Sequence, residues 1–377
     1  MTDLDWPFYE PHHREVAQWV EDWCAASAAF HGSDVDAECR TIVASLGKSP
    51  LLQIVAPSGG ASYSVRSIAL VRERLAYHSG LADFAFAMQG LGLGPIVLAG
   101  TDEQKREWAA QVESGAAIAA FALTEPETGS DAANVAMTAR RDGERWVLDG
   151  EKSYISNGTI ADFLTVFART GEGDGARGVS AFLVRGDAPG LSVAERIEVI
   201  APHPLARLRF ESVPAELIGQ SGEGFRIAMQ TLNVFRIGVG GAALGFARRA
   251  LDEAIAFAAT RRLGSGTLAD NAVTQAKLAD MALAIDSAAL LIARAAWQQD
   301  TQNRDNRRAA AMAKLHATEA AQQVIDAAVQ MHGGAGVTRG VKVEELYRDI
   351  RALRIYEGAS EVQRQIIARD MLKEHAQ

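Results

Sequence analysis

Residues 278–295 read LADMALAIDSAALLIARA, and their apolar side chains recur at steps of three and four residues. That spacing gives a helix one apolar side, and its members are Leu278, Met281, Ile285, Ala288, Ile292 and Ala295. Because such a stripe suits packing between long helices, it predicts a helical bundle. The helical period continues from about residue 222 to the end of the sequence.

The residues that precede this bundle have a different period. Between residues 135 and 217, short β-branched and aromatic runs are bounded by Gly and Asp, and Leu208 and Phe210 alternate with arginines. This favours an antiparallel β domain. Residues before about 120 again have helical spacing, and Thr101 with Gln104 predicts a capping box at a helix start. We therefore expect a mainly α, α+β chain with domains at 1–120, 121–221 and 222–377.

Composition excludes several classes of protein. Of 377 residues, 48% are hydrophobic, and 38 Lys and Arg against 47 Asp and Glu give a net charge of −9, which argues against disorder and nucleic-acid binding. The two cysteines, Cys24 and Cys39, are too few for a disulfide framework and are not spaced as a metal site. We expect a cytoplasmic protein with no metal, no signal peptide and no membrane span, since the apolar runs are shorter than roughly 18 residues.

Four segments combine residue types that could bind a ligand or carry out chemistry. They read FALTEPETGSD at 121–131, KSYISNG at 152–158, QMHGGAGV at 330–337 and YRDIRALRIYEGASEVQR at 347–364. The first presents hydroxyls and amides, or is a plain connection with a capping box at Thr124 and Glu127. In the second, strand alternation puts Tyr154 and Ser156 on one face, as a support for a flat heterocycle or as an ordinary sheet face. The third has three glycines, enough for a helix end and for close approach of a phosphate.

The fourth segment contains a carboxylate at a corner between helices. A helix is expected to end near Tyr356, Glu357 and Gly358 form the break, and Ser360 with Gln363 predicts the next capping box. At such a corner Glu357 could project into a cleft, or it could be a helix-end residue with no chemistry.

Taken together, and in this order, the four segments resemble the acyl-CoA dehydrogenase family of flavoproteins. The resemblance covers nearly the whole chain. It implies an N-terminal helical domain, a central β domain, a C-terminal four-helix bundle, bound FAD and a homotetramer built as a dimer of dimers. It also implies oxidation of an acyl-CoA to a trans-2-enoyl-CoA, with electrons passed to an electron-transfer flavoprotein.

The resemblance assigns roles to individual residues. Glu357 would remove the α-proton, its own backbone N–H would help to polarise the thioester carbonyl, and flavin N5 would accept the β-hydride. The residues expected to bind the cofactor are Leu123, Thr124, Ser130, Tyr154, Ser156, Arg261, Gln330, Gly333 and Gly334. Those expected to bind the substrate are Ser130, Asn233, Phe235, Arg236 and Gly358.

The sequence departs from the family pattern at three positions. Gly264 stands where a Phe is usual, Ala272 where a Gln contacts FAD, and Ala359 where a Thr follows the catalytic Glu and Gly. These changes imply looser FAD binding or a different closure of the loop at 264–266.

Phe235 bears on the choice of base and on the substrate. In a minority of the family the base aligns with this position; a Phe cannot be a base, so Glu357 is the candidate, and the Phe235 ring implies a short or specially shaped acyl group. Two alternatives stay open: an oxidase, monooxygenase or desulfinase reaction on the same flavin, or a non-catalytic helical scaffold.

Overall fold

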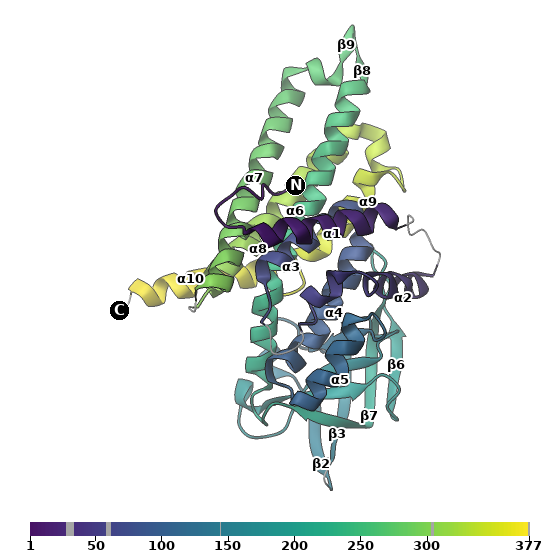
Figure 1. Ribbon diagram of the computed structural model, residues 1–377, viewed down its shortest axis with the longest axis vertical. Coiled ribbons are helices and arrows are strands. Elements are labelled where there is room, and N and C mark those ends of the chain that lie inside the picture. The colour runs from purple at the N-terminus through teal and green to yellow at the C-terminus, as the bar shows by residue number, and fades with distance from the viewer. Residues whose placement is uncertain (28–33, 58–61, 144, 303–304, 376–377) are drawn as a thin grey trace. The chain divides into compact units, whose positions relative to one another are not determined.

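A computed structural model describes residues 1–27, 34–57, 62–143, 145–302 and 305–375 (Figure 1). The chain forms two compact units. We call Met1–Cys24, Ser64–Asp83 and Arg236–Gln377 the helical unit, and Ala25–Tyr63 and Phe84–Phe235 the sheet unit. The chain passes between the units four times: near the end of α1 (Pro11–Ala26), between Tyr63 and Ser64, within α4 (Gly80–Ala99) and within α6 (Gly224–Thr260).

The sheet unit contains helices and a seven-stranded sheet. Its helices are α2 (Val35–Leu46), η1 (Pro50–Ile54), α5 (Asp102–Glu113), η2 (Ala132–Asn134) and η3 (Gly175–Gly178). Its strands are β1 (Ala119–Ala122), β2 (Thr138–Asp142), β3 (Arg145–Ser156), β4 (Phe163–Arg169), β5 (Val179–Arg185), β6 (Leu191–Arg196) and β7 (Leu205–Ile218). The strand order is β1-β4-β2-β3-β7-β5, with β6 paired to β7 and β4 also paired to β5.

The expected antiparallel sheet is present, with two parallel pairings added. Strand pairs β2–β3, β3–β7, β4–β5, β5–β7 and β6–β7 are antiparallel, whereas β4 pairs in parallel with β1 and, at its end, with β2. Strand β4 is buried on both faces, because Phe163 and Phe167 enter one core cluster while Leu164 and Val166 enter another. Such two-sided burial explains its nearly continuous apolar sequence.

The capping box expected before α5 is also confirmed. The Thr101 hydroxyl accepts the Gln104 N–H at 3.2 Å, and the Gln104 side chain accepts the Thr101 N–H at 3.0 Å. One turn later Trp108 is buried against Phe163 of the sheet. The local signal and the packed face therefore agree.

The helical unit contains the longest helices, as the sequence predicts. It comprises α1 (Pro11–Ala26), α3 (Val65–His78), α7 (Ala272–Thr301), α8 (Arg307–His332), α9 (Lys342–Leu353), α10 (Ser360–His375) and most of α6, together with the short elements β8 (Arg262–Leu263), β9 (Gly266–Thr267), η4 (Leu268–Asp270) and η5 (Gly333–Val337). Helix α8 contacts α7, α9 and α10, and α3 contacts α7. Most of the predicted stripe of α7 is core: Met281, Ile285, Ala288, Ile292 and Ala295 are buried, and Leu278 is partly buried.

Glycines let α3 and α6 approach backbone to backbone. A Cβ at Gly241 would lie 2.4 Å from the Ala69 carbonyl oxygen, and one at Gly245 would lie 2.0 Å from that of Glu73. Both distances are far below van der Waals contact, so only glycine is compatible with this crossing. The close approach fixes the position of the buried charged residues on α3.

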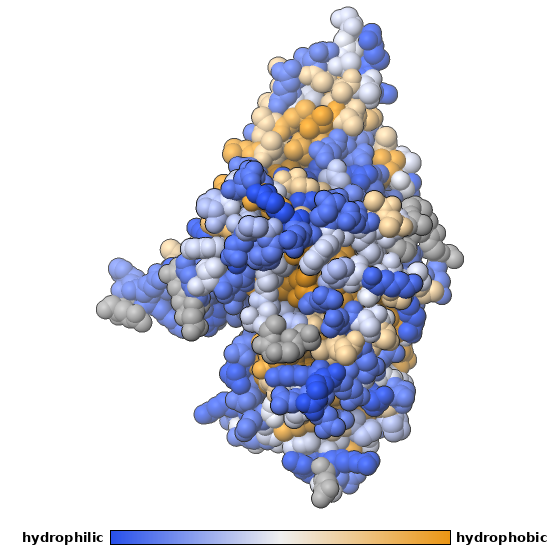
Figure 2. All heavy atoms as spheres, in the orientation of Figure 1, coloured by the Kyte–Doolittle hydropathy of each residue, from blue (hydrophilic) through white to orange (hydrophobic). Residues whose placement is uncertain are grey.

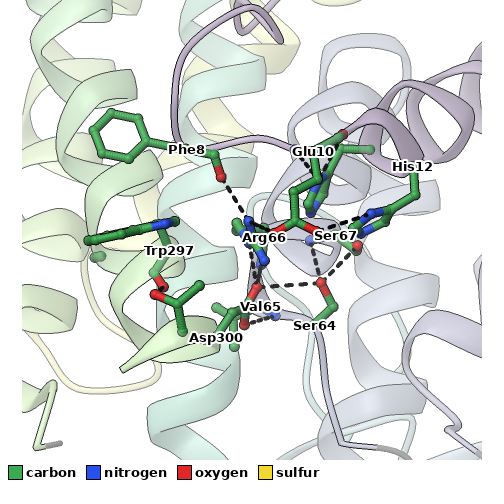
Figure 3. A network of polar contacts seen from close by, with 12 residues as sticks. Phe8, Glu10, His12, Ser64, Val65, Arg66, Ser67, Trp297 and Asp300 are labelled. Atoms are coloured by element: carbon green, nitrogen blue, oxygen red, sulfur yellow. Dashed lines mark hydrogen bonds and ion pairs between the residues drawn. The ribbon is translucent and has the colours of Figure 1, made fainter. Parts of the chain in front are cut away.

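The start of α3 is held by a carboxylate from the end of α7 (Figure 3). Asp300 accepts the Val65 N–H at 2.7 Å and the Arg66 Nε–H at 2.8 Å. The Arg66 guanidinium also donates to the Phe8 carbonyl at 2.9 Å and to Glu10 at 3.0 Å. One buried arginine thus ties the N-terminal segment to two helices of the helical unit.

Within the part of the chain that the structure describes, two helices are long and apolar enough to cross a membrane by length and composition alone, namely α4 and α6. In their apolar windows 72% and 78% of the residues are buried inside the protein. Core helices of globular domains have the same property.

Candidate functional site

In the sheet unit, the segment at 121–131 is a tight turn attached to strand β3. Glu125 and Thr128 exchange backbone hydrogen bonds of 3.0 and 3.2 Å, so the alternative of a helix with a capping box does not apply. Ser153 N–H donates to the Thr124 carbonyl at 2.9 Å. The structure therefore brings Thr124 beside the strand that carries Tyr154.

A buried ion pair lies beneath this turn. Lys152 Nζ is 2.8 Å from Glu125 and donates to the Leu123 carbonyl at 2.9 Å, and the lysine is 0% exposed. Glu125 also accepts the backbone N–H groups of Ala136 and Met137. Burial lowers the pKa of Lys152 to about 8, against the opposing effect of Glu125. Leu123 and Thr124 are thus held by a charged pair that sequence reasoning did not single out.

Strand β3 is irregular where Tyr154 and Ser156 lie. The register with β7 shifts between Lys152 and Ile155, and Tyr154 has φ +56°. The Tyr154 ring is 63% exposed, Ile155 is buried and Ser156 is partly buried. Tyr154 is therefore exposed and Ser156 partly exposed, and a bulge replaces the simple alternation that the sequence predicted. Ser130 lies exposed at the end of the turn.

On α6, Phe235 is buried within the sheet unit and Asn233 is partly buried. The Phe235 ring packs edge-on against Tyr63 at 5.3 Å between centroids. A Cβ at Gly90 would lie 2.5 Å from this ring, so the ring occupies the space beside that glycine. The next residue, Arg236, belongs to the helical unit and is also buried.

In the helical unit, Glu357 lies in a turn between α9 and α10. Helix α9 ends at Leu353, three residues before the expected end at Tyr356. Glu357 has φ +51° and Gly358 has φ +93°, two successive left-handed residues that reverse the chain. Among the described residues, the buried Oε2 atom of Glu357 has no hydrogen-bond partner. Its backbone N–H likewise donates to none of the described residues.

Three side chains donate hydrogen bonds to the carbonyls of this turn. Arg236 Nε donates to the Glu357 carbonyl at 3.3 Å. Lys314 Nζ on α8 donates to the Gly358 carbonyl at 2.8 Å. Gln363 Nε2 donates to the same Gly358 carbonyl at 2.8 Å. The predicted capping box of Ser360 and Gln363 is therefore wrong, because the Gln363 amide bonds the preceding turn instead.

Buried charges act electrostatically on the Glu357 carboxyl. Arg72 donates through Nε and Nη2 to Asp83 at 2.8 and 2.9 Å, and their side chains are 2% and 4% exposed. Burial raises the pKa of Glu357, while Arg72, Lys314 and Arg236 oppose the rise and Asp83 adds to it. Burial also lowers the pKa of Lys314 to about 8. A carboxyl with a raised pKa and one unpaired oxygen is suited to accept a proton near neutral pH.

Sequence reasoning missed Arg72, Asp83 and Lys314. For Lys314 a signal existed, because it falls on the stripe formed by Ala310, Ala317 and Ala321, where a charge is out of place. Arg72 gives no such signal, since charged residues occur throughout the α3 segment.

The ends of α6 and α8 lie side by side. The ring of Phe257 stacks on His332 with centroids 4.3 Å apart, so Arg261, four residues after Phe257, is on the same end of the helical unit as Gly333. Gln330, Gly333 and Gly334 are exposed, and Gly333 has φ +58°.

The family departures fall on exposed or partly exposed positions. Gly264 has φ +61° and forms the turn of the β8–β9 hairpin, so the loop there closes as a two-stranded ribbon. Ala272 is the first residue of α7 and is exposed, and Ala359 immediately precedes α10.

The residues expected to hold FAD fit that molecule. An added Cβ at Gly333 or Gly334 would meet nothing within 4 Å, which leaves open space against the backbone there. Arg261 is an exposed cation on the same end, as a pyrophosphate requires. In the sheet unit, the exposed Tyr154 ring offers a flat apolar surface for a planar ring system.

Comparison with known proteins supports this interpretation. Sequence models of the N-terminal, middle and C-terminal domains of acyl-CoA dehydrogenase match residues 10–116, 120–213 and 222–372. The human short-chain specific acyl-CoA dehydrogenase of mitochondria is 40% identical over 96% of this chain and 90% of its own length. A 3-(aryl)acrylate reductase of Clostridium sporogenes is 35% identical over 97% of this chain and 100% of its own.

A solved structure from Acidaminococcus fermentans, described under the name of its electron transferring flavoprotein, has a TM-score of 0.88. It is 31% identical and covers 96% of this chain and 98% of that one. The fold, the three matched domains and the full-length relatives agree with one another. The chain therefore belongs to the acyl-CoA dehydrogenase family, and it is an FAD-dependent oxidoreductase.

Proposed function

We propose that this protein oxidises a short acyl-CoA to the trans-2-enoyl-CoA, with Glu357 as the general base. The observation that supports this most is the Glu357 carboxyl itself, which has a raised pKa and an oxygen without a partner among the described residues. In the reaction the proton from Cα goes to Glu357, and the C–H electron pair at Cβ leaves as hydride. FAD, when bound, supplies the hydride acceptor.

The acidity of the α-proton depends on the thioester carbonyl. A backbone N–H that donates to none of the described residues, that of Glu357, is available to this oxygen. Arg236 bonds the carbonyl of the same residue and so orients the peptide. Asn233 and Ser130 remain the proposed contacts for the rest of the CoA thioester.

A short acyl group is favoured by the bulk beside Arg236. The Phe235 ring fills the space next to Gly90 and Tyr63 in the sheet unit. The human relative is named for short-chain substrates. The Clostridium relative is named for reduction of an arylacrylate, so the assay includes aryl substrates and the reverse direction.

An electron-transfer flavoprotein is the proposed electron acceptor. The Acidaminococcus structure is described under the name of such a flavoprotein.

A homotetramer is the proposed assembly. Figure 2 shows apolar residues on the surface of α6 and α7, and the exposed ones are Ile255, Val273, Leu283 and Leu290. Sedimentation analysis tests the assembly.

A cytoplasmic location is proposed from the free thiols of Cys24 and Cys39 and is tested by cell fractionation.

The decisive experiment compares wild type with Glu357→Gln by flavin bleaching. The holoenzyme is mixed anaerobically with straight, branched, cyclic and aryl acyl-CoAs, and the enoyl product is identified by mass spectrometry. Glu357→Gln keeps the shape and FAD but removes the base, so we expect it to lose most of the bleaching. Exposed Glu15→Gln on α1, outside every candidate segment, serves as the control and should bleach at the wild-type rate.

Two results would contradict the proposal. Near-normal bleaching of Glu357→Gln would exclude this residue as the base. Rapid reoxidation by O₂ with peroxide or an oxygenated product, in place of transfer to a dye or flavoprotein acceptor, would favour the oxidase or monooxygenase alternative.

A further inference from the structure

The turn that carries Glu357 is attached to α8 at two places. Lys314 Nζ donates to the Gly358 carbonyl at 2.8 Å, and this lysine is 0% exposed. Five residues later on the same helix, Glu319 accepts hydrogen bonds from Ser360 and from Arg354, the latter at 3.1 Å. The two anchors lie on either side of Glu357 along the chain.

A buried lysine on an alanine-rich helix face requires a compensating interaction. Leaving an ammonium without one costs several kcal/mol, and an uncharged side chain would fit the surrounding alanines without that penalty. Among the described residues, the one acceptor of a hydrogen bond from Lys314 Nζ is the Gly358 carbonyl. The position of this charge is therefore explained by the turn and not by the packing of α8.

We propose that Lys314 is a positioning residue for Glu357. By bonding the Gly358 carbonyl it fixes two successive left-handed residues, and its positive charge acts on the Glu357 carboxyl from α8. Gln363 shares the same carbonyl but is neutral. Comparing the two residues therefore separates two effects. Gln363 only holds the backbone of the turn, whereas Lys314 holds it and also supplies a positive charge.

Other charged groups face the same carboxyl and must be held constant. Those acting on Glu357 are Arg72 on α3, Asp83 on α4, Arg236 on α6 and the neighbouring Tyr356. Those acting on Lys314 are Glu357, Arg236, Glu319 and Glu361. The variants below change none of them.

The test uses the FAD-loaded enzyme and the variants Lys314→Met and Gln363→Leu, with exposed Lys48→Met as the control. This inference rests on the proposed function of Glu357, so two readouts are taken. Flavin bleaching by saturating acyl-CoA is followed against pH. Amide hydrogen exchange of the peptide at 354–360 is followed without substrate, so it does not depend on the reaction.

For Lys314→Met we expect bleaching to slow roughly 100-fold at saturating substrate, because a misplacement of about 1 Å has that effect. The half-saturating substrate concentration should change little. The acid limb of the rate profile should move to higher pH, because loss of a nearby positive charge makes Glu357 harder to deprotonate. Exchange at 354–360 should rise while exchange in the rest of α8 stays at the wild-type level.

For Gln363→Leu we expect slower bleaching and faster exchange at 354–360 with an unmoved acid limb. The proposal is overturned if Lys314→Met keeps the wild-type rate, acid limb and exchange, or if exchange rises along all of α8. If Lys314→Met does not retain FAD, Gln363→Leu decides, and wild-type values there overturn the proposal. If wild type is bleached by no acyl-CoA, the proposed function fails while exchange still tests Lys314.

Discussion

The buried pair of Arg72 and Asp83 offers a test of both the stability and the chemistry of the Glu357 site. The perturbations are Arg72→Met, Asp83→Asn and the double variant. The pair is joined by hydrogen bonds of 2.8 and 2.9 Å, and its side chains are 2% and 4% exposed. Removing one partner leaves an uncompensated buried charge, which destabilises proteins by about 3–5 kcal/mol. Removing both leaves neither charge, so the double variant should be destabilised by far less than the sum of the single variants.

The same variants shift the pKa of Glu357 in opposite directions. Arg72 holds that pKa down and Asp83 holds it up. Because Glu357, as the proposed base, acts only when deprotonated, Arg72→Met should move the acid limb of the flavin-bleaching rate profile to higher pH and Asp83→Asn should move it to lower pH. The double variant should lie between them.

The assays are urea unfolding at fixed protein and FAD concentrations, and anaerobic bleaching from about pH 5 to pH 9. Each variant is compared with wild type in the same buffers, and FAD content is checked by absorbance. Additive losses of unfolding free energy would refute the paired-charge argument. An acid limb that stays in place in Arg72→Met would refute the electrostatic one.

Three further predictions concern packing and pH. Gly245→Ala should lower the free energy of unfolding in urea by about 2 kcal/mol or more, because its Cβ would lie 2.0 Å from a backbone oxygen. Gly240→Ala, whose Cβ would have its nearest neighbour at 3.2 Å, should stay within about 1 kcal/mol of wild type. Equal unfolding free energies of the two variants would contradict this. Phe235→Ala should lower the free energy of unfolding by about 3–5 kcal/mol. Its flavin should also be bleached by longer or branched acyl-CoAs, and an unchanged substrate profile would count against the proposal that Phe235 limits the acyl group. Burial raises the pKa of Asp349 to about 7, so its contribution to stability is present below about pH 4 and lost as pH rises through 7. Relative to wild type, the unfolding free energy of Asp349→Asn should therefore rise by about 2–4 kcal/mol between pH 4 and pH 8. Plots of unfolding free energy against pH that run parallel for the two proteins would exclude this.

Features that depend on neighbours in the chain could be predicted from the sequence. The α7 stripe and the Thr101 capping box are set by residues three and four apart, and both are confirmed. The order of helices, sheet and bundle followed from the same periodicities. The parallel pairing of β1 with β4 could not be predicted, because it joins residues 119–122 to 163–166.

The site was predictable only in part, for the same reason. The motif around Glu357 identified the candidate base, but the charges that surround it come from α3, α4, α6 and α8. The capping box at Ser360 failed because the Ser360 N–H donates to the Arg354 carbonyl and its hydroxyl donates to Glu319, while the Gln363 amide donates to carbonyls of the Glu357 turn. A local pattern shows which donors exist, and only the fold shows which acceptors they reach.

The left-handed backbone of Glu357 has a consequence for engineering. A residue with a Cβ at φ +51° is destabilised by roughly 1–2 kcal/mol relative to glycine, which adopts this conformation freely. A library sorted for heat resistance alone would therefore enrich glycine at position 357 and discard the proposed base. Stabilised versions of this enzyme have to be selected on turnover in the same round, since a change at this position that raises stability lowers activity.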